Sequence, residues 1–519
     1  MSERRNTVFK GAVILVLSGI FVKVLGMFYK IPLTNLIGDS GMGYFGSAYT
    51  VYTLFYTLST AGVPTALALL VSEKKSLGDF EGAKEIYKTS LKLFLLIGLL
   101  LSAAMAAFSG EIASLIGNSL SKNAIMAAAP AVFFICGVSA FRGYFQGCKC
   151  MEPTAISQVI EASGKLLFGL FLAREALLSG KAIHNVAAYA VIGLSLSSGM
   201  AFLFLLITSL IKKDREFTEL SRLTRARKKR GFFSSSLEII KTAFPITLSS
   251  SVMTLASVFD LVLVMNSLQK IGYSSLYANT LYGNYTSLAV PLFNMPTSLV
   301  IPIALSITPY IRAAKTNGDS ETVKKFTERT VRITSLIAMP AAIGMAFLSK
   351  PILSFIYTNE ESVRMAHTLL TLLAPSIFFL SLLSSSNLML QAMGRIYIPV
   401  IAMGVGALLK CVTVGPFTLR FGMSGAPLST LVSYAVSSLI AVIFTVREAK
   451  VERIASKIYF LPLLCALLCG VSAFTVSCLT ANLIEPVSLI LSIGAGGIIY
   501  IIAAVLCGLF KGLYEKKVK

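Results

Sequence analysis

Residues 90–109 read SLKLFLLIGLLLSAAMAAFS, an apolar run in which Lys92 is the one charged side chain. A helix of about 20 such residues spans about 30 Å, the thickness of the hydrocarbon layer of a bilayer. This run is therefore predicted to be a transmembrane helix. The whole chain shares its character, since 55% of the 519 residues are hydrophobic, 13% are charged and the mean hydropathy is +0.78. An average soluble domain is far more polar.

Similar apolar runs recur on both sides of this one, and together they predict an all-α polytopic membrane protein. We expect fourteen spans, at residues 8–33, 44–71, 90–109, 124–147, 154–173, 186–211, 243–267, 276–310, 330–349, 366–391, 396–418, 424–446, 458–480 and 486–510. The sequence contains no Walker A, HExxH or GxSxG motif, so nothing in it favours an enzyme.

The basic residues support this count, because Lys and Arg near the ends of spans favour the cytoplasmic side. With both termini in the cytoplasm, 35 of the 46 Lys and Arg fall in cytoplasmic segments, 8 fall outside and 3 lie within spans. An odd number of spans would remove this bias. Topology and anionic headgroups explain the net charge of +22, so we expect no nucleic-acid partner. The first span is too long for the core of a signal peptide, so we expect it to remain in the mature protein as a membrane anchor.

Internal similarity divides the chain. Gln146 and Lys165 are matched at one offset by Gln391 and Lys410, and Gly78-Asp79 is matched by Gly318-Asp319. Each repeat holds six spans, an even number, so both copies should enter the membrane in the same orientation. We predict an N-lobe at 1–211, a basic cytoplasmic linker at 212–240, a C-lobe at 241–450, and two further spans with a basic tail at 451–519.

Charged residues within the spans are the candidate site, because an ionisable group in the bilayer normally faces a wet cavity or a partner. Glu161 precedes Lys165 by four residues, so the two could pair on one helix face or serve a substrate. Lys30 and Arg142 lie near span ends, where they could mark the membrane interface or line the cavity. The residues in question are Lys23, Lys30, Arg142, Glu161, Lys165, Lys410 and Asp260.

The span at 276–310 is unusual for its four prolines, because each removes a backbone donor and tends to break the helix. It is either an ordinary kinked helix or a broken helix that presents Asn284 and Asn294 to the interior. The central lysines outnumber the acids, which indicates a cationic cavity suited to phosphate or pyrophosphate. The two histidines and eight cysteines lack ligand spacing, so neither a metal nor a cofactor is expected.

Several motifs resemble the polysaccharide-transport members of the multidrug/oligosaccharidyl-lipid/polysaccharide (MOP) flippase superfamily, in particular the group of stage V sporulation protein B and MurJ-like lipid II flippases. They are VKVLGMFYKIPLTNLIGDSGMGY at 22–44, LSTAGVPTA at 58–66, FRGYFQG at 141–147, EPTAISQVIE at 152–161 and YGNYTSLAVPLFNMP at 282–296.

The resemblance implies two six-helix lobes in a V shape, two extra C-terminal helices, and alternating access in a bacterial cell membrane. The implied cargo is a polyprenyl-pyrophosphate-linked saccharide carried from the inner to the outer leaflet. Lys23 and Lys30 lie where the family carries cationic residues for the pyrophosphate, with Lys in place of Arg. A basic residue that relatives carry in helix eight is absent here, where the sequence reads Tyr285-Thr-Ser-Leu-Ala.

Three functions follow as hypotheses. The first is a flippase for lipid II, or for another lipid-linked saccharide such as an exopolysaccharide unit, acting as a monomer among membrane lipids and with envelope-synthesis enzymes as candidate partners. The second is a cation-coupled multidrug exporter of the same superfamily, in which Asp260 would bind the coupling ion. The third is a membrane scaffold that uses the basic loop at 212–240.

Overall fold

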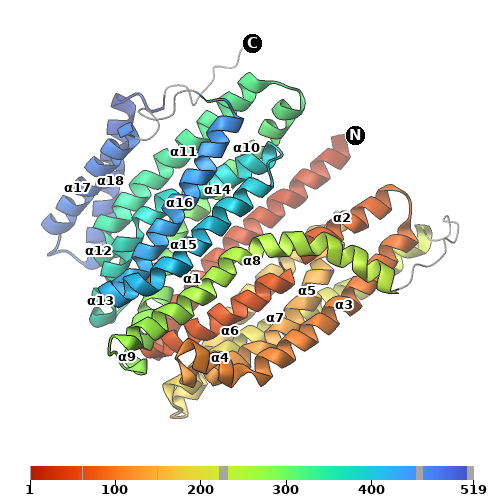
Figure 1. Ribbon diagram of the computed structural model, residues 1–519, viewed down its shortest axis with the longest axis horizontal. Coiled ribbons are helices and arrows are strands. Elements are labelled where there is room, and N and C mark those ends of the chain that lie inside the picture. The colour runs from red at the N-terminus through yellow and green to blue at the C-terminus, as the bar shows by residue number, and fades with distance from the viewer. Residues whose placement is uncertain (1, 61, 149, 221–231, 452–459, 511–519) are drawn as a thin grey trace. The chain divides into compact units, whose positions relative to one another are not determined.

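The computed structural model describes residues 2–60, 62–148, 150–220, 232–451 and 460–510 (Figure 1). These described residues are mostly helical and contain no strand, so the predicted all-α class is confirmed. Ten helical stretches among them, or up to eleven if the bent pair α13 and α14 counts as one span, are long and apolar enough to cross a membrane. Each of the fourteen predicted spans coincides with a helix or with successive helices.

The chain divides into two compact units. Unit 1 comprises Met1–Met265 and Ser275–Gly283, and unit 2 comprises Asn266–Ser274 and Asn284–Lys519. This division differs from the predicted lobes, because most of α8 groups with unit 1. Of the predicted linker, residues 221–231 lie outside the described residues, and the described remainder is largely helical.

Unit 1 is a helical bundle in which α5, α6 and α7 pack against one another and α3 packs against α5. Its elements are α1 (Ser2–Thr60), α2 (Val63–Ser76), α3 (Phe80–Ala107), α4 (Ser109–Ile116), η1 (Ser119–Ser121), α5 (Lys122–Gly147), α6 (Glu152–Leu178), α7 (Ile183–Leu220), most of α8 (Phe232–Lys270) and α9 (Ser275–Gly283).

Helix α1 consists of two arms that meet at Gly38, whose φ of 64° lies in the left-handed region that favours glycine. The predicted break between the first two spans is therefore found here. Beyond the bend, Asn279 of α9 donates from Nδ2 to the carbonyl of Ser40 at 2.8 Å and accepts from Asn118 Nδ2 at 2.7 Å. These buried amides are satisfied by one another, so α9 is fixed against the bend of α1.

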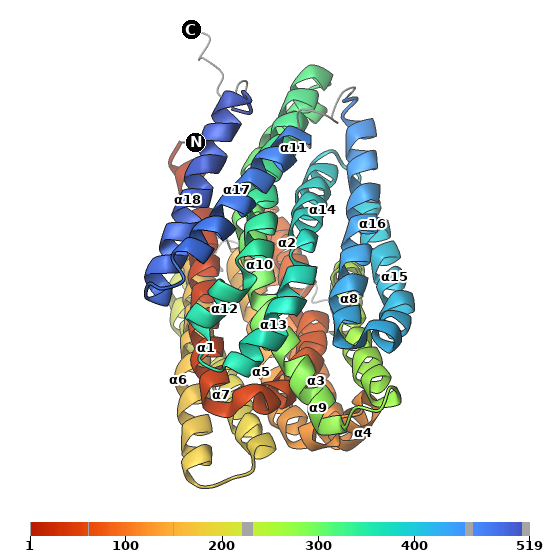
Figure 2. The same cartoon turned by 90° about the vertical axis from the view of Figure 1, so that its left-hand side faces the viewer.

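Unit 2 contains the remaining helices, with α15 packed on α16 and α11 on α17. Its elements are η3 (Asn284–Ala289), α10 (Val290–Thr316), α11 (Ser320–Phe347), α12 (Ser349–Ile356), α13 (Glu360–Leu373), α14 (Pro375–Ala392), α15 (Tyr397–Phe421), η4 (Gly422–Ser424), α16 (Gly425–Glu448), α17 (Leu461–Leu479) and α18 (Glu485–Leu506). Figure 2 shows α17 and α18 side by side, in agreement with their close packing.

The proline-rich span is interrupted at its start. Element η3 is a π-helix, and Pro291 lies in the first turn of α10, where a missing N–H costs little. The hydroxyl of Tyr357 donates to the carbonyl of Ser287 within the π-helix at 3.2 Å. After this interruption α10 continues as a helix through Pro296, Pro302 and Pro309. The predicted break therefore precedes the prolines.

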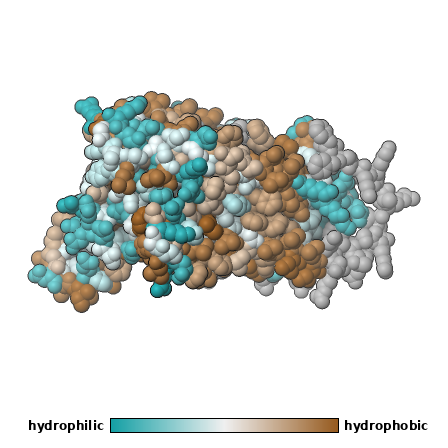
Figure 3. All heavy atoms as spheres, turned by 90° about the horizontal axis from the view of Figure 1, so that it is seen from below, coloured by the Kyte–Doolittle hydropathy of each residue, from teal (hydrophilic) through white to brown (hydrophobic). Residues whose placement is uncertain are grey.

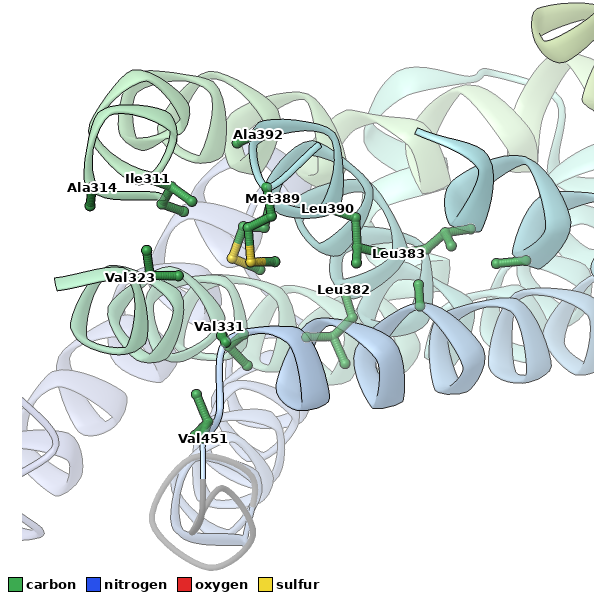
Figure 4. Packing of buried hydrophobic residues seen from close by; sticks show 14 residues of the cluster. Ile311, Ala314, Val323, Val331, Leu382, Leu383, Met389, Leu390, Ala392 and Val451 are labelled. Atoms are coloured by element: carbon green, nitrogen blue, oxygen red, sulfur yellow. The ribbon is translucent and has the colours of Figure 1, made fainter. Parts of the chain in front are cut away.

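A hydrophobic cluster holds α10, α11, α14 and α16 together (Figure 4). Val323 and Val331 of α11 lie two turns apart, and Leu382, Met389 and Leu390 of α14 belong to the same cluster. Because α11 packs against α14, these side chains contribute to one shared core.

Apolar side chains also cover the outside of the helices, as the brown stretches between teal areas in Figure 3 show for one face. On α18, Ile490 is 70% exposed and Leu506 is 81% exposed. Exposed apolar surface on this scale is unusual for a soluble protein and is expected where lipid is the solvent. The protein is therefore a multi-pass membrane protein.

Candidate functional site

A buried ion pair joins α5 to α6 in unit 1. Arg142 donates from Nη2 to Glu161 Oε2 at 2.9 Å and from Nε to Ser157 Oγ at 3.0 Å, and its side chain is only 8% exposed. A buried charge requires such partners, because removal from water is otherwise costly. Glu161 is thus paired with Arg142, and the alternative of an ion pair with Lys165 is wrong.

Lys165, one turn further along α6, lies between two aromatic rings. Its ammonium nitrogen is 4.3 Å from the ring centre of Tyr49 and 5.1 Å from that of Tyr29. Both distances are within the range of cation–π attraction. Tyr29 is almost fully buried on the first arm of α1 and donates its hydroxyl proton to the carbonyl of Ala190. The two arms of α1 therefore hold Lys165 from two directions.

Lys30 approaches the same ring as Lys165. Its ammonium nitrogen is 5.9 Å from the ring centre of Tyr49, and the two ammonium groups are close enough to repel each other. Together with the Arg142–Glu161 pair, the four side chains carry a formal charge of +2. Two ammonium groups beside one aromatic ring, with the nearby carboxylate already bound to Arg142, form an arrangement that an anion would stabilise. We call these four charged residues and Tyr49 the cationic cluster.

The other candidates of unit 1 lie apart from these contacts. The side chain of Lys23 is exposed on the first arm of α1. Asp260 is buried on α8. Of the residues predicted from the sequence, the structure brings together Lys30, Arg142, Glu161 and Lys165.

Three further candidates belong to unit 2. Lys410 is half-buried on α15. Asn284 is buried in the π-helix, and its amide donates to the sulfur of Met365 at 3.6 Å. Asn294 is exposed and donates to the carbonyl of Val290 in its own helix, so its amide is used within α10.

Sequence reasoning missed the tyrosines. Phe45, Tyr49, Tyr52 and Tyr56 follow one another at spacings of four, three and four residues, and neighbouring ring centres are 5.7, 5.9 and 5.8 Å apart. This spacing places them on one face of the second arm of α1. The 4-3-4 pattern was visible in the sequence, but in a hydrophobic span it is also typical of ordinary helix packing.

Unit 2 has an apolar groove of about 470 Å³ between α11, α14 and α17. Met339 and Ile343 of α11, Phe378 and Phe379 of α14, and Leu463 of α17 are among its lining residues. A surface of this chemistry suits a hydrocarbon chain. In the part of the chain that the structure describes, no three His, Cys, Asp or Glu side chains come together as a metal site requires.

Comparisons with known proteins agree with this fold. The chain is 24% identical to the lipid II flippase MurJ of Bacillus subtilis (strain 168) over 98% of this chain and 96% of that protein. It is 23% identical to stage V sporulation protein B of the same organism over the same shares. An uncharacterized membrane protein of that organism, YabM, is 27% identical over 83% of this chain and 79% of its own length.

Solved structures show the same architecture. A lipid II flippase MurJ in an inward closed conformation superposes with a TM-score of 0.73 at 19% identity, covering 95% of this chain and 98% of that one. An inward-facing multidrug resistance MATE family transporter of the MOP superfamily gives 0.69 at 16% identity, covering 83% and 94%. The model of the MatE family matches residues 285–414, and that of the family described as polysaccharide biosynthesis protein matches residues 8–315. The chain therefore belongs to the polysaccharide biosynthesis protein family of the MOP flippase superfamily.

Proposed function

We propose that this protein is a flippase that moves a polyprenyl-diphosphate-linked saccharide, lipid II or a related envelope precursor, from the inner to the outer leaflet. The observation that carries the proposal is that Lys30 and Lys165 both lie near the ring of Tyr49, while the carboxylate of Glu161 is paired with Arg142. A diphosphate carries two or more negative charges and matches the charge of +2 in the cationic cluster. Lysine ammonium groups are common ligands of phosphate oxygens.

The apolar groove of unit 2 supports the same proposal. A polyprenyl tail has to stay in an apolar environment while its headgroup crosses the membrane. The groove is lined by α17, the thirteenth predicted span, as well as by α11 and α14, and its walls are almost entirely hydrocarbon. We propose that it guides the tail, and that Lys23 and Lys410 are further cationic contacts for the headgroup.

The test is the accessibility of lipid II to an external probe in cells depleted of this protein and its functional relatives. Wild type should restore external lipid II, and a variant with Lys30→Ala and Lys165→Ala should restore less than a tenth of it at equal expression. Lys122→Ala, which removes an exposed lysine outside the cluster, is the matched control and should behave as wild type. Full restoration by the double variant would refute the diphosphate site.

A second function has one specific observation in its favour, the match of residues 285–414 to the MatE family. A cation-coupled multidrug exporter would use an acidic residue such as the buried Asp260. Overexpression would then confer resistance to cationic drugs, and Asp260→Asn would abolish it. Unchanged drug sensitivity on overexpression would exclude the multidrug exporter and leave the flippase as the proposed function.

A further inference from the structure

The aromatic row of α1 extends beyond the cationic cluster. From Tyr49 the row continues through Tyr52 to Tyr56, with ring centres 5.9 and 5.8 Å apart. Seven residues of helix separate Tyr49 from Tyr56, a rise of about 10 Å. Tyr52 is 3% exposed and packs against both Tyr49 and Tyr56, which are half-buried. Tyr56 is therefore partly exposed, and it lies on the side of the cluster toward Thr60.

A polar row on α6 accompanies these rings. Gln158, Glu161 and Lys165 are spaced by three and four residues and share one face of the helix. Lys165 lies on Tyr49, and the carboxylate of Glu161 is close enough to interact electrostatically with the phenols of Tyr52 and Tyr56. Arg142 lies within similar reach of Tyr56. Helix α1 packs against both α5 and α6, and the Arg142–Glu161 pair that joins those two helices is within electrostatic reach of the Tyr56 end of the row.

This combination has the chemistry of a saccharide site. One face of a sugar ring presents C–H bonds, which the electron-rich face of an aromatic ring attracts. The hydroxyl groups at its edge require donors and acceptors in fixed positions. Arg142 and Glu161 supply both, because their ion pair holds a guanidinium and a carboxylate in place. The ion pair joins Arg142 to Oε2 of Glu161, and Oε1 of that carboxylate is the atom we assign to a sugar hydroxyl.

We propose that Tyr56, with the Arg142–Glu161 pair, binds the first sugar of the lipid-linked saccharide, while the diphosphate lies at Lys30 and Lys165. This inference rests on the proposed function and adds to it a residue that distinguishes a glycosylated carrier from a bare one. The length of the row from Tyr49 to Tyr56 sets the distance between the bound diphosphate and the bound first sugar. Sugar recognition depends on the aromatic face of residue 56, and its hydroxyl is dispensable.

The test measures binding of two probes to the purified full-length protein, farnesyl diphosphate and the same lipid carrying one N-acetylglucosamine. Tyr56→Leu should weaken binding of the glycosylated probe about tenfold and change binding of the bare probe less than twofold. Tyr56→Phe keeps the ring and should bind both probes as wild type does. Phe28→Leu removes an aromatic ring that is 62% exposed on the other arm of α1 and is the matched control.

The outcomes separate this inference from the proposed function. Equal weakening of both probes by Tyr56→Leu, or no effect on either, would overturn the sugar site while leaving the diphosphate site intact. Failure of wild type to bind the bare probe, or binding that survives Lys30→Ala and Lys165→Ala together, would overturn the diphosphate site and the sugar site with it. Selective loss of the glycosylated probe in Tyr56→Leu, with Tyr56→Phe normal, is the result that we expect.

Discussion

At the scale of single residues, Arg142 provides the counter-charge of Glu161. Arg142 is buried and the side chain of Glu161 is 17% exposed, so removal of Arg142 would leave a mostly desolvated carboxylate without its counter-charge. We predict that Arg142→Met destabilises the protein by about 3 kcal/mol, as expected when one partner of a buried pair is removed. The double variant with Arg142→Met and Glu161→Gln should recover much of this loss. Thermal unfolding in detergent, followed by the remaining folded fraction, is the measurement.

The control for that experiment is Arg174→Met, which removes an exposed arginine near the end of α6 in the same unit. It should change the unfolding temperature little, because exposed charges contribute little to stability. A double variant less stable than the single one would show that the pair itself, rather than the unpaired charge, provides the stability.

Glu448 makes a pH-dependent contact at the end of α16. It accepts from Lys315 Nζ at 2.9 Å and from Arg395 Nε at 3.0 Å, and these hydrogen bonds lower the pKa of its carboxyl below the ordinary value of 4.5. Because the pKa of Glu448 is lower in the folded state than in the unfolded state, its ionised carboxylate stabilises the folded protein. This stabilisation is complete above the unfolded-state pKa and is lost as the pH falls through the folded-state pKa.

We therefore predict that Glu448→Gln lowers stability at pH 7 modestly, because Lys315 and Arg395 are partly solvated. The difference between wild type and variant should stay constant from pH 7 to 5 and shrink below about pH 4.5. Thermal unfolding of both proteins across this range would show it. A difference that grows on acidification would contradict the assigned direction of the pKa.

At the scale of elements, the turn that precedes α3 has the same structure as the turn that precedes α11. Gly78 and Gly318 have φ of 72° and 74°, and the aspartates that follow them cap α3 and α11 by accepting from Gly82 N–H and Thr322 N–H. The sequence match between the two halves therefore corresponds to the same local structure. We predict that Asp79→Ala costs about 1 kcal/mol of local helix stability. Hydrogen exchange should become faster in the first turn of α3 and stay unchanged in α11, with Asp319→Ala giving the reverse pattern.

The spans could be predicted from the sequence because lipid requires long apolar helices, but their interruptions could not. The second predicted span, 44–71, is broken near Gly62. A Cβ at that position would lie 2.3 Å from the carbonyl oxygen of Ala243 and 2.3 Å from Oγ1 of Thr247. Position 62 thus has room only for glycine, because α8, which is remote in sequence, approaches the chain closely there. Likewise, hydropathy and proline positions alone did not reveal the π-helix before Pro291.

At the scale of the whole molecule, the sequence identified the charges of the cationic cluster but not their partners. Lys165 has Glu161 at the spacing of an ion pair, yet Arg142 binds that carboxylate. The hydrophobic pattern places residues on helix faces, and it does not say which distant helix supplies the next group. Tyr49 joins Lys30 and Lys165 because α1 bends at Gly38 and returns along α6, a contact between positions more than a hundred residues apart.

The bias of Lys and Arg predicts that both termini are cytoplasmic. Within unit 2 the structure supports this alternation, because Lys315 and Arg395, two basic residues assigned to different cytoplasmic loops, share the carboxylate of Glu448 and so lie at one end of the unit. Fusions of green fluorescent protein and of alkaline phosphatase test the orientation. The former should fluoresce when fused after Lys519, and the latter should be active when inserted near Gly180, in a loop assigned to the outside.

The expected pattern depends on an even number of spans between the two ends. Alkaline phosphatase activity after Lys519, with a silent fusion near Gly180, would invert the whole topology and place the basic loops outside, against the positive-inside rule. Activity at both positions would mean that an even number of spans lies between Gly180 and Lys519, in place of the nine that the sequence predicts. A further fusion after Val451 would decide whether the miscount lies before α17 or within α17 and α18.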